Sequence, residues 1–164
     1  MLLQLRSLFA GETARLPIET ECDLSQLELF GSRPFRRPAL VRGEAVSSAG
    51  IVTLHLTVTT WYEGVCDRCA SPLCREDRLT IEHTLVTSVS NEENDELILV
   101  ENFCLPLDEL VSDDVLLALP SKNLCRPDCR GLCPCCGKNL NEGPCSCTPA
   151  AADPRLDVLR QLIE

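Results

Sequence analysis

Alternating hydrophobic and polar residues predict a β-sheet in the first half of the chain. Over residues 51–61, threonine and histidine alternate with four apolar residues, namely Val52, Leu54, Leu56 and Val58. A period of two places neighbouring side chains on opposite faces of a strand, so one face is buried and the other is wetter. Residues 39–46 and 78–89 have the same character, and residues 47–50 predict a turn. Three adjacent strands without intervening helices indicate an antiparallel sheet.

Shorter elements flank this sheet. Residues 13–20 and 97–100 are candidate strands, and residues 90–96 are expected to form a polar, acidic loop. The stretch 33–38 is too rich in proline for a helix and predicts an extended linker. For the arginines of this linker, a solvated loop is favoured over an RNA contact.

Two short helices are expected. Residues 106–119 have apolar side chains at helical spacing and acidic residues near the start, and Pro120 follows the end. Near the C-terminus, Asp153 as an N-cap and Pro154 at the first helical position precede a leucine stripe. The histidine at position 83 lies on the apolar face of its strand, so we interpret His83 as a core residue with one hydrogen bond rather than as a metal ligand.

Cysteine is the most informative residue of the second half. The chain of 164 residues contains 12 cysteines, and residues 124–148 hold almost no core-forming side chains. That segment cannot pack a hydrophobic core and must be organised by other means. Close cysteine pairs can organise the segment by binding a metal ion, because each pair points two sulfurs at one ion. A tetrahedral zinc ion takes four sulfurs. We predict two structural zinc ions held by four pairs: Cys66/Cys69, Cys125/Cys129, Cys133/Cys136 and Cys145/Cys147.

Spacing alone leaves open how these eight cysteines divide between the two ions. The preferred grouping joins Cys133/Cys136 with Cys145/Cys147, because a short ribbon can close between them. Cys66/Cys69 then join Cys125/Cys129. Among the remaining cysteines, Cys22 and Cys104 are expected to be packed as small hydrophobes. Cys74 and Cys135 lie near enough to the pairs to substitute for a ligand.

These patterns predict an α+β fold that is mainly β: an antiparallel sheet or partly open barrel with one or two short helices and a C-terminal cysteine-rich zinc-binding segment. The predicted domains are a β-rich domain over residues 1–121 and a zinc-binding tail over residues 122–164. No apolar run approaches the roughly 18 residues that span a bilayer. The first residues lack a basic leader, so we expect a cytoplasmic protein. In that reducing compartment cysteines usually bind metal or perform redox chemistry.

The formal net charge of −10 is confined to one segment. Residues 79–121 contain ten acidic residues and no lysine or arginine, while the rest of the chain is neutral. RNA binding by a general basic surface is therefore disfavoured, because phosphate neutralisation needs clustered basic residues. A basic protein partner or a local RNA contact fits better, although a solvated acidic face is the simpler interpretation. Four basic residues near the cysteines either contact phosphates or balance thiolate charge: Lys122, Arg126, Arg130 and Lys138.

No catalytic constellation is present in the sequence. It has no glycine-rich phosphate loop and no G-x-S-x-G elbow, and its two histidines stand alone in strand patterns. A zinc ion held by four thiolates offers no open position for a reactive water. We therefore interpret the protein as a non-enzyme.

The cysteine pattern resembles the YceD family, the large ribosomal RNA subunit accumulation proteins. The resemblance covers about 100 residues and is carried by Cys66-Asp67-Arg68-Cys69, Leu116-Leu117-Ala118-Leu119-Pro120, the run from Cys125 to Asn141, Cys145-Ser146-Cys147 and Asp153-Pro154-Arg155. It implies a bacterial cytoplasmic factor needed for accumulation of large-subunit 23S ribosomal RNA, through synthesis, processing or assembly. Some family members lack the C-terminal cysteines, which implies that the metal stabilises one branch of the family.

Two function classes follow. The first is a ribosome-biogenesis factor that contacts pre-ribosomal large-subunit RNA or a large-subunit ribosomal protein, with no membrane and no small-molecule substrate. The alternative is a zinc-dependent thiol redox sensor or chaperone, in which oxidation ejects zinc and unfolds the C-terminal segment. A simple thiol–disulfide pair is disfavoured, because no βαβ pattern surrounds Cys66.

Overall fold

The computed structural model describes residues 1–88 and 97–148. The predicted acidic loop at 90–96 and the predicted helix after Asp153 lie outside the described residues. The chain divides into two compact units. The first comprises Met1–Gly64 and Leu73–Ser121, and the second comprises Val65–Pro72 and Lys122–Glu164.

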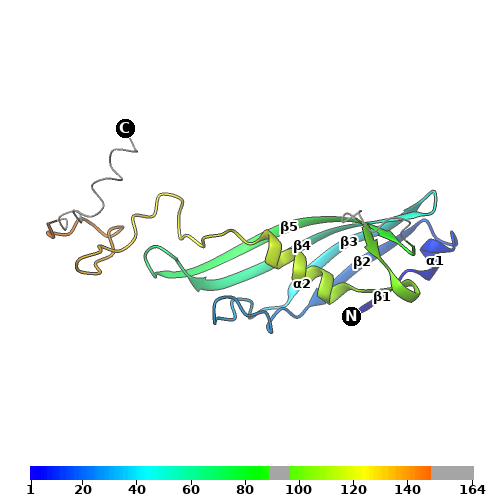
Figure 1. The fold of residues 1–164 in the computed structure, drawn as a ribbon, viewed down its shortest axis with the longest axis horizontal. Helices are drawn as coiled ribbons and strands as arrows, with labels where there is room; N and C mark the ends of the chain where they lie inside the picture. The colour runs from blue at the N-terminus through cyan, green and yellow to red at the C-terminus, as the bar shows by residue number, and fades with distance from the viewer. Residues whose placement is uncertain (89–96, 149–164) are drawn as a thin grey trace, which may run out of the picture. The chain divides into compact units, whose positions relative to one another are not determined.

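The first unit is built on a five-stranded sheet (Figure 1). In spatial order, its strands are β2 (Arg15–Cys22), β3 (Ala39–Ser48), β4 (Ile51–Val65), β5 (Pro72–Val86) and β6 (Leu97–Leu99). Strand β3 pairs antiparallel with both β2 and β4, as the alternating pattern predicts. Strands β4 and β5 extend beyond the predicted ranges by several residues, up to the short segment that joins them.

Two pairings were not predicted from the sequence. Strand β6 joins the sheet parallel to β5, with Leu85 opposite Ile98. A separate two-stranded sheet pairs β1 (Leu2–Gln4) antiparallel with β7 (Cys104–Pro106). The helix α1 (Arg6–Phe9) follows β1, and the 3₁₀ helix η1 (Glu101–Phe103) precedes β7.

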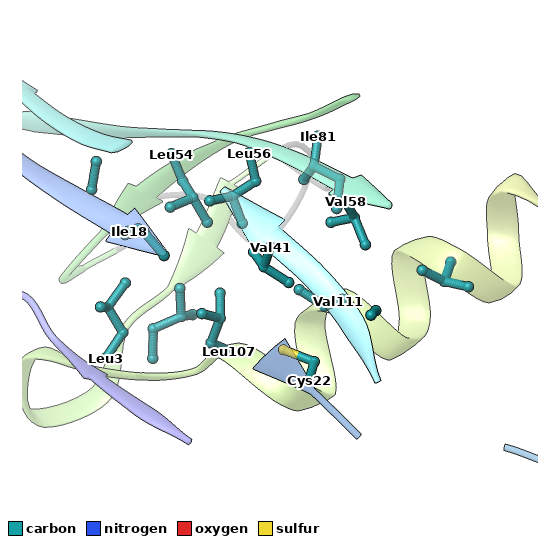
Figure 2. Close-up of a cluster of buried hydrophobic side chains, with 14 of the residues drawn as sticks. Leu3, Ile18, Cys22, Val41, Leu54, Leu56, Val58, Ile81, Leu107 and Val111 are labelled. Atoms are coloured by element: carbon teal, nitrogen blue, oxygen red, sulfur yellow. The ribbon is translucent and has the colours of Figure 1, made fainter. Parts of the chain in front are cut away.

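The core of this unit lies between the sheet and helix α2 (Leu107–Ala118). Every second residue of β4 points inward and is almost fully buried from Val52 to Val58. From α2, Leu107, Val111 and Val115 are buried, which is the i, i+4 spacing of one helix face. Figure 2 shows Leu107 and Val111 gathered with Val41, Leu56 and Cys22 from the sheet. The predicted fold class, mainly β with one or two short helices, is confirmed, and α1 is a helix that the sequence pattern did not indicate.

His83 has one hydrogen bond, as predicted. Its side chain is half-buried on β5, and its Nε2 atom lies 2.8 Å from Oδ2 of Asp114 on α2. The pair links the sheet to the helix. Within the described ranges, no helix is long and apolar enough to cross a membrane.

The connection between β2 and β3 is anchored to the core. Residues 33–38 are non-helical, as the prolines predict. Phe35 is buried, and its ring packs edge-to-face against Tyr62 with a centroid distance of 6.1 Å. The carbonyl oxygen of Pro34 accepts a hydrogen bond from the amide of Glu63 at 2.8 Å. Leu24, at the other end of the connection, is also buried.

Candidate metal centre

Four cysteines from two distant parts of the sequence converge in the second unit. We call this group the first cluster: Cys66, Cys69, Cys125 and Cys129. Its sulfurs lie within 4.8 Å of one another. The Sγ atoms of Cys66 and Cys129 are 3.8 Å apart, and those of Cys69 and Cys125 are 3.7 Å apart. A zinc ion bonded to four sulfurs at about 2.3 Å has neighbouring sulfurs about 3.8 Å apart, so these thiols fit such an ion.

Four further cysteines form the second cluster: Cys133, Cys136, Cys145 and Cys147. Its four sulfurs also lie within 4.8 Å of one another, and the Sγ atoms of Cys133 and Cys145 are 3.4 Å apart. A tight turn aims the first pair inward. In this turn, the amide of Gly137 donates to the carbonyl oxygen of Cys133 at 2.9 Å. The amide of Cys133 donates to the carbonyl oxygen of Lys138 at 2.8 Å. The cysteine pairs therefore come together in the grouping that their spacing along the sequence favoured.

Backbone amides stabilise one thiolate in each cluster. Burial alone would raise the pKa of Cys66, but amide N–H groups of Cys125, Arg68 and Cys69 donate to its sulfur and lower the pKa to about 6. In the second cluster, the amides of Cys136 and Cys135 lower the pKa of Cys133, also to about 6. The sequence Cys-x-x-Cys thus places backbone donors around the first sulfur of the turn.

Crowding has the opposite effect on another thiol of each cluster. Burial, and then the neighbouring sulfurs of Cys129, Cys69 and Cys66, raise the pKa of Cys125 to about 12. The thiol of Cys136 is the largest cause that raises the pKa of Cys147 to about 12. Four thiolates at this separation repel one another unless a cation lies among them. A divalent ion bound by deprotonated thiols removes that repulsion, so the donor set fits a metal such as zinc.

Backbone contacts hold the two halves of the first cluster together. The amide of Asp67 donates to the carbonyl oxygen of Asn123 at 2.9 Å. The amide of Leu132 donates to the carbonyl oxygen of Arg68 at 3.1 Å. Gly131 makes this approach possible. Its φ is +74°, and a Cβ atom at this position would lie 3.0 Å from the carbonyl oxygen of Arg68. A larger residue would therefore strain the backbone and push the tail away from the 66–69 turn.

Asn141 is a hydrogen-bonding centre that sequence analysis did not single out. Its Nδ2 atom donates to Sγ of Cys129 at 3.3 Å and to Oδ1 of Asn139 at 2.9 Å. Its Oδ1 atom accepts from Nη2 of Arg126 and from the amide of Arg130, both at 2.8 Å. The only available signal was the Asn-x-Asn sequence that follows the Cys-x-x-Cys-Gly turn. Such outer contacts orient metal ligands and tune the charge on them.

The four basic residues predicted as candidate RNA contacts are all exposed, but they are not equivalent. Arg126 bonds Asn141 and lies 3.5 Å from a carboxylate oxygen of Asp128. The Nζ atom of Lys138 donates to the carbonyl oxygen of Pro144 at 2.9 Å. These two side chains stabilise local loops. Among the described residues, the side chains of Lys122 and Arg130 have no hydrogen bond or ion pair, and their contact with RNA stays a prediction.

The other four cysteines lie outside both clusters. Cys22 is buried in the core of the first unit, and burial raises its pKa. Cys104 is half-buried and its sulfur accepts a hydrogen bond from Nε2 of Gln4 at 3.2 Å. Cys74 and Cys135 are exposed, and neither joins a group of four. All twelve cysteines are free, so no disulfide competes with metal binding.

The fold and the two clusters define a mainly β protein with a cysteine-rich unit whose thiols can hold two metal ions. Residues 54–163 match the family model described as Large ribosomal RNA subunit accumulation protein YceD, and the chain belongs to this family. The resemblance indicated by the cysteine motifs is thereby confirmed.

Three curated relatives are similar over 108 residues at 35% identity: uncharacterized proteins from Mycobacterium bovis and from two strains of Mycobacterium tuberculosis. The matching region covers 63% of this chain and 51% of each relative. The chain therefore spans about half the length of the curated relatives it matches. No solved structure matches the chain.

Proposed function

We propose that this protein is a non-enzymatic ribosome-biogenesis factor that promotes accumulation of large-subunit 23S ribosomal RNA. The observation that carries the proposal is membership of a family named for large ribosomal RNA subunit accumulation, over residues 54–163. The proposed place of action is the cytoplasm, where ribosomal precursors form. Synthesis, processing and assembly of the RNA are all steps at which such a factor can act.

In this proposal the eight clustered cysteines hold two structural zinc ions. The sulfur separations of 3.7 and 3.8 Å in the first cluster support this assignment, because they equal the edge of a tetrahedral zinc–sulfur site. Zinc would supply the folding free energy that the described tail residues 122–148 cannot obtain from a hydrophobic core. Each site would be filled by four protein ligands, so the metal is assigned a structural role rather than a catalytic one.

The proposed partner is pre-ribosomal large-subunit RNA or a large-subunit ribosomal protein. The net charge of −10 supports a local contact rather than broad electrostatic attraction to RNA. Helix α2 presents exposed Glu109 and Asp113 in an acidic region, and a basic ribosomal protein would complement it.

The direct test is deletion of the gene, followed by measurement of mature 23S RNA relative to 16S RNA. We expect the ratio to fall and to recover when the wild-type gene is restored. Affinity isolation of the tagged protein from growing cells should recover precursors of the large subunit. An unchanged ratio in the deletion strain would contradict the proposal. If such cells were instead sensitive to peroxide, the thiol redox alternative would replace it.

A complementation series separates the function from the metal. Restoring the gene with Cys133→Ser removes one ligand of the second cluster, while Cys135→Ser removes an exposed cysteine outside it. We expect Cys135→Ser to restore the RNA ratio fully. The Cys133→Ser protein should accumulate to a lower level, because its cysteine-rich unit lacks one stabilising ion.

A further inference from the structure

The connection between β2 and β3 carries an unusual turn at its tip (Figure 1). Leu29 and Ser32 exchange two backbone hydrogen bonds of 2.8 and 2.9 Å, so Phe30 and Gly31 form a two-residue hairpin loop. Both loop residues have positive φ, 49° for Phe30 and 76° for Gly31. The Phe30 side chain is fully exposed.

Phenylalanine is a poor choice for this position on folding grounds. A hairpin loop with two positive φ angles favours Asn-Gly or Asp-Gly, because a bulky side chain crowds the backbone in the left-handed region. The exposed ring also gains no burial from folding. A strained backbone and an unburied aromatic ring at one residue point to a role outside the fold of this unit.

The base of the connection is rigidly seated. Leu24 and Phe35 are each only 1% exposed, and Leu29 packs against the same core. Pro34 is tied to Glu63 through the 2.8 Å backbone hydrogen bond. The buried anchors hold the intervening residues at the surface, so the tip is a supported platform rather than a loose loop.

Basic residues follow the aromatic tip along the chain. Residues 29–38 contain three arginines and no acidic residue, and the exposed Glu28 precedes them. Arg33 is exposed, and Arg36 and Arg37 share one carboxylate, that of Glu63, at 3.8 and 3.7 Å. With one carboxylate for three arginines, the side of the connection that follows the ring carries net positive charge. Such a surface complements a polyanion.

We infer that Phe30 and the neighbouring Arg33, Arg36 and Arg37 form a contact for unpaired RNA. An exposed base stacks on the Phe30 ring, and the guanidinium groups contact the adjacent phosphates. Proteins recognise single-stranded RNA through aromatic stacking and basic side chains, and stacking tolerates any base because every base has a π-face. This inference rests on the proposed function and adds to it the part of the protein that touches the RNA.

The test uses a variant that the turn itself accommodates. Phe30→Asn introduces the Asn-Gly pair that this loop geometry prefers, so it removes the ring without disturbing the fold. The probe is a short, fluorescently labelled single-stranded RNA of mixed sequence, measured by anisotropy at low salt with the full chain. We expect the dissociation constant to rise between about fivefold and a hundredfold, the effect of one base–aromatic stack.

Controls separate stacking from charge. Leu117→Asn removes an exposed apolar side chain from a different element, α2, and should leave the affinity unchanged. Arg33→Gln should weaken binding and reduce its salt dependence, whereas Arg15→Gln removes an exposed charge elsewhere and should do neither. A duplex of the same RNA should be insensitive to Phe30→Asn, because its bases are already stacked. Equal affinities of the wild-type and Phe30→Asn proteins for the single strand, or no binding by the wild type, overturn the inference.

The RNA-binding test of Phe30→Asn and the deletion test of the proposed function can fail independently. If deletion lowers the 23S to 16S ratio but Phe30→Asn binds the single strand like the wild type, the proposed function stands and this contact is wrong. If Phe30→Asn weakens RNA binding but deletion leaves the ratio unchanged, the contact stands and the proposed function fails. A Phe30→Asn protein that loses a co-purifying ribosomal protein, with unchanged RNA affinity, assigns the tip to a protein partner and also overturns the inference.

Discussion

The Nδ2 atom of Asn141 donates a hydrogen bond to the sulfur of Cys129, across a distance of 3.3 Å. The same side chain accepts hydrogen bonds from Arg126 and from the amide of Arg130. Asn141 therefore connects a candidate ligand of the first cluster to the backbone between the two clusters. An amide donor next to a thiolate also delocalises its negative charge, which strengthens the site for a metal ion.

Replacing Asn141 should weaken metal binding at the first cluster. We expect Asn141→Ala to lower zinc affinity about 10- to 100-fold, the usual effect of removing an outer hydrogen bond. Asn141→Asp should be worse, because its carboxylate faces a thiolate. Competition with a calibrated chelator measures the affinity. Asn139→Ala removes hydrogen bonds with Ser71, Glu142 and Asn141 but none to sulfur, so it should have the smaller effect. Equal losses in both variants would show that the loop, not the sulfur contact, matters.

The purified protein should contain about two zinc ions per chain, because two groups of four thiols are present. Elemental analysis of anaerobically purified protein gives the ratio. Cys66→Ser and Cys133→Ser each disable one cluster and should lower the content to about one ion. Cys74→Ser removes an exposed cysteine from β5 and should leave it at two. A wild-type protein without metal would contradict the assignment of both clusters.

Alkylation should distinguish ligands from other exposed cysteines. Cys125 and Cys136 belong to the clusters, while Cys74 and Cys135 do not, and all four are exposed. In metal-loaded protein, iodoacetamide should modify only the latter two of these four, because bound metal masks the thiolates. A chelator should make Cys125 and Cys136 reactive as well. Mass spectrometry of the peptides measures which cysteines are modified. Buried Cys22 is the control, because it should react only on unfolding. Modification of Cys136 before Cys135 in loaded protein would exclude Cys136 as a ligand.

Chelation should unfold the second unit and spare the sheet. A structural zinc site contributes about 10–16 kcal/mol of apparent binding free energy in peptides, and that energy is also folding free energy. Residues 122–148 have no comparable apolar core, whereas the first unit buries apolar side chains from β2 to β5 and α2. Hydrogen exchange should lose protection at residues 65–72 and 122–148 and retain it in β3. Uniform loss over the whole chain would show that both units unfold as one.

The turn at Phe30 should respond to substitution in a way that ordinary surface positions do not. Phe30→Asn should raise the unfolding free energy by roughly 0.5–1 kcal/mol, because asparagine tolerates the left-handed region better than phenylalanine. Gly31→Ala should lower it by about 1–2 kcal/mol, since the φ of 76° strains any residue with a Cβ atom although the space around it is open. Thermal denaturation of both variants measures these shifts. A destabilised Phe30→Asn protein would mean that the ring supports the fold.

Sequence patterns predicted those parts of the structure that depend on local chemistry. The alternation from Val52 to Val58 indicated β4, because a period of two specifies a half-buried strand. The cysteine spacing indicated the pairs that come together in both clusters, because each close pair is a local device. In contrast, β1 and β7 have three residues each, too few for a periodic pattern, and the strand expected at 97–100 gave no sign that it would pair parallel with β5. The pairing of β1 with β7 joins distant parts of the chain. The contact between Asn141 and Cys129 is nearer in sequence, but no local pattern specifies it.

The two clusters differ in how far apart their cysteines lie along the chain. This difference sets the order in which the clusters can form during synthesis. The second cluster closes within one short stretch of chain. In the first, Cys125 follows Cys69 by 56 residues. At about 5–20 residues per second, a ribosome needs roughly 3–11 seconds to add that interval. For that time Cys66 and Cys69 are a two-thiol half-site on a nascent chain, so the first cluster can close only after Cys129 has been translated.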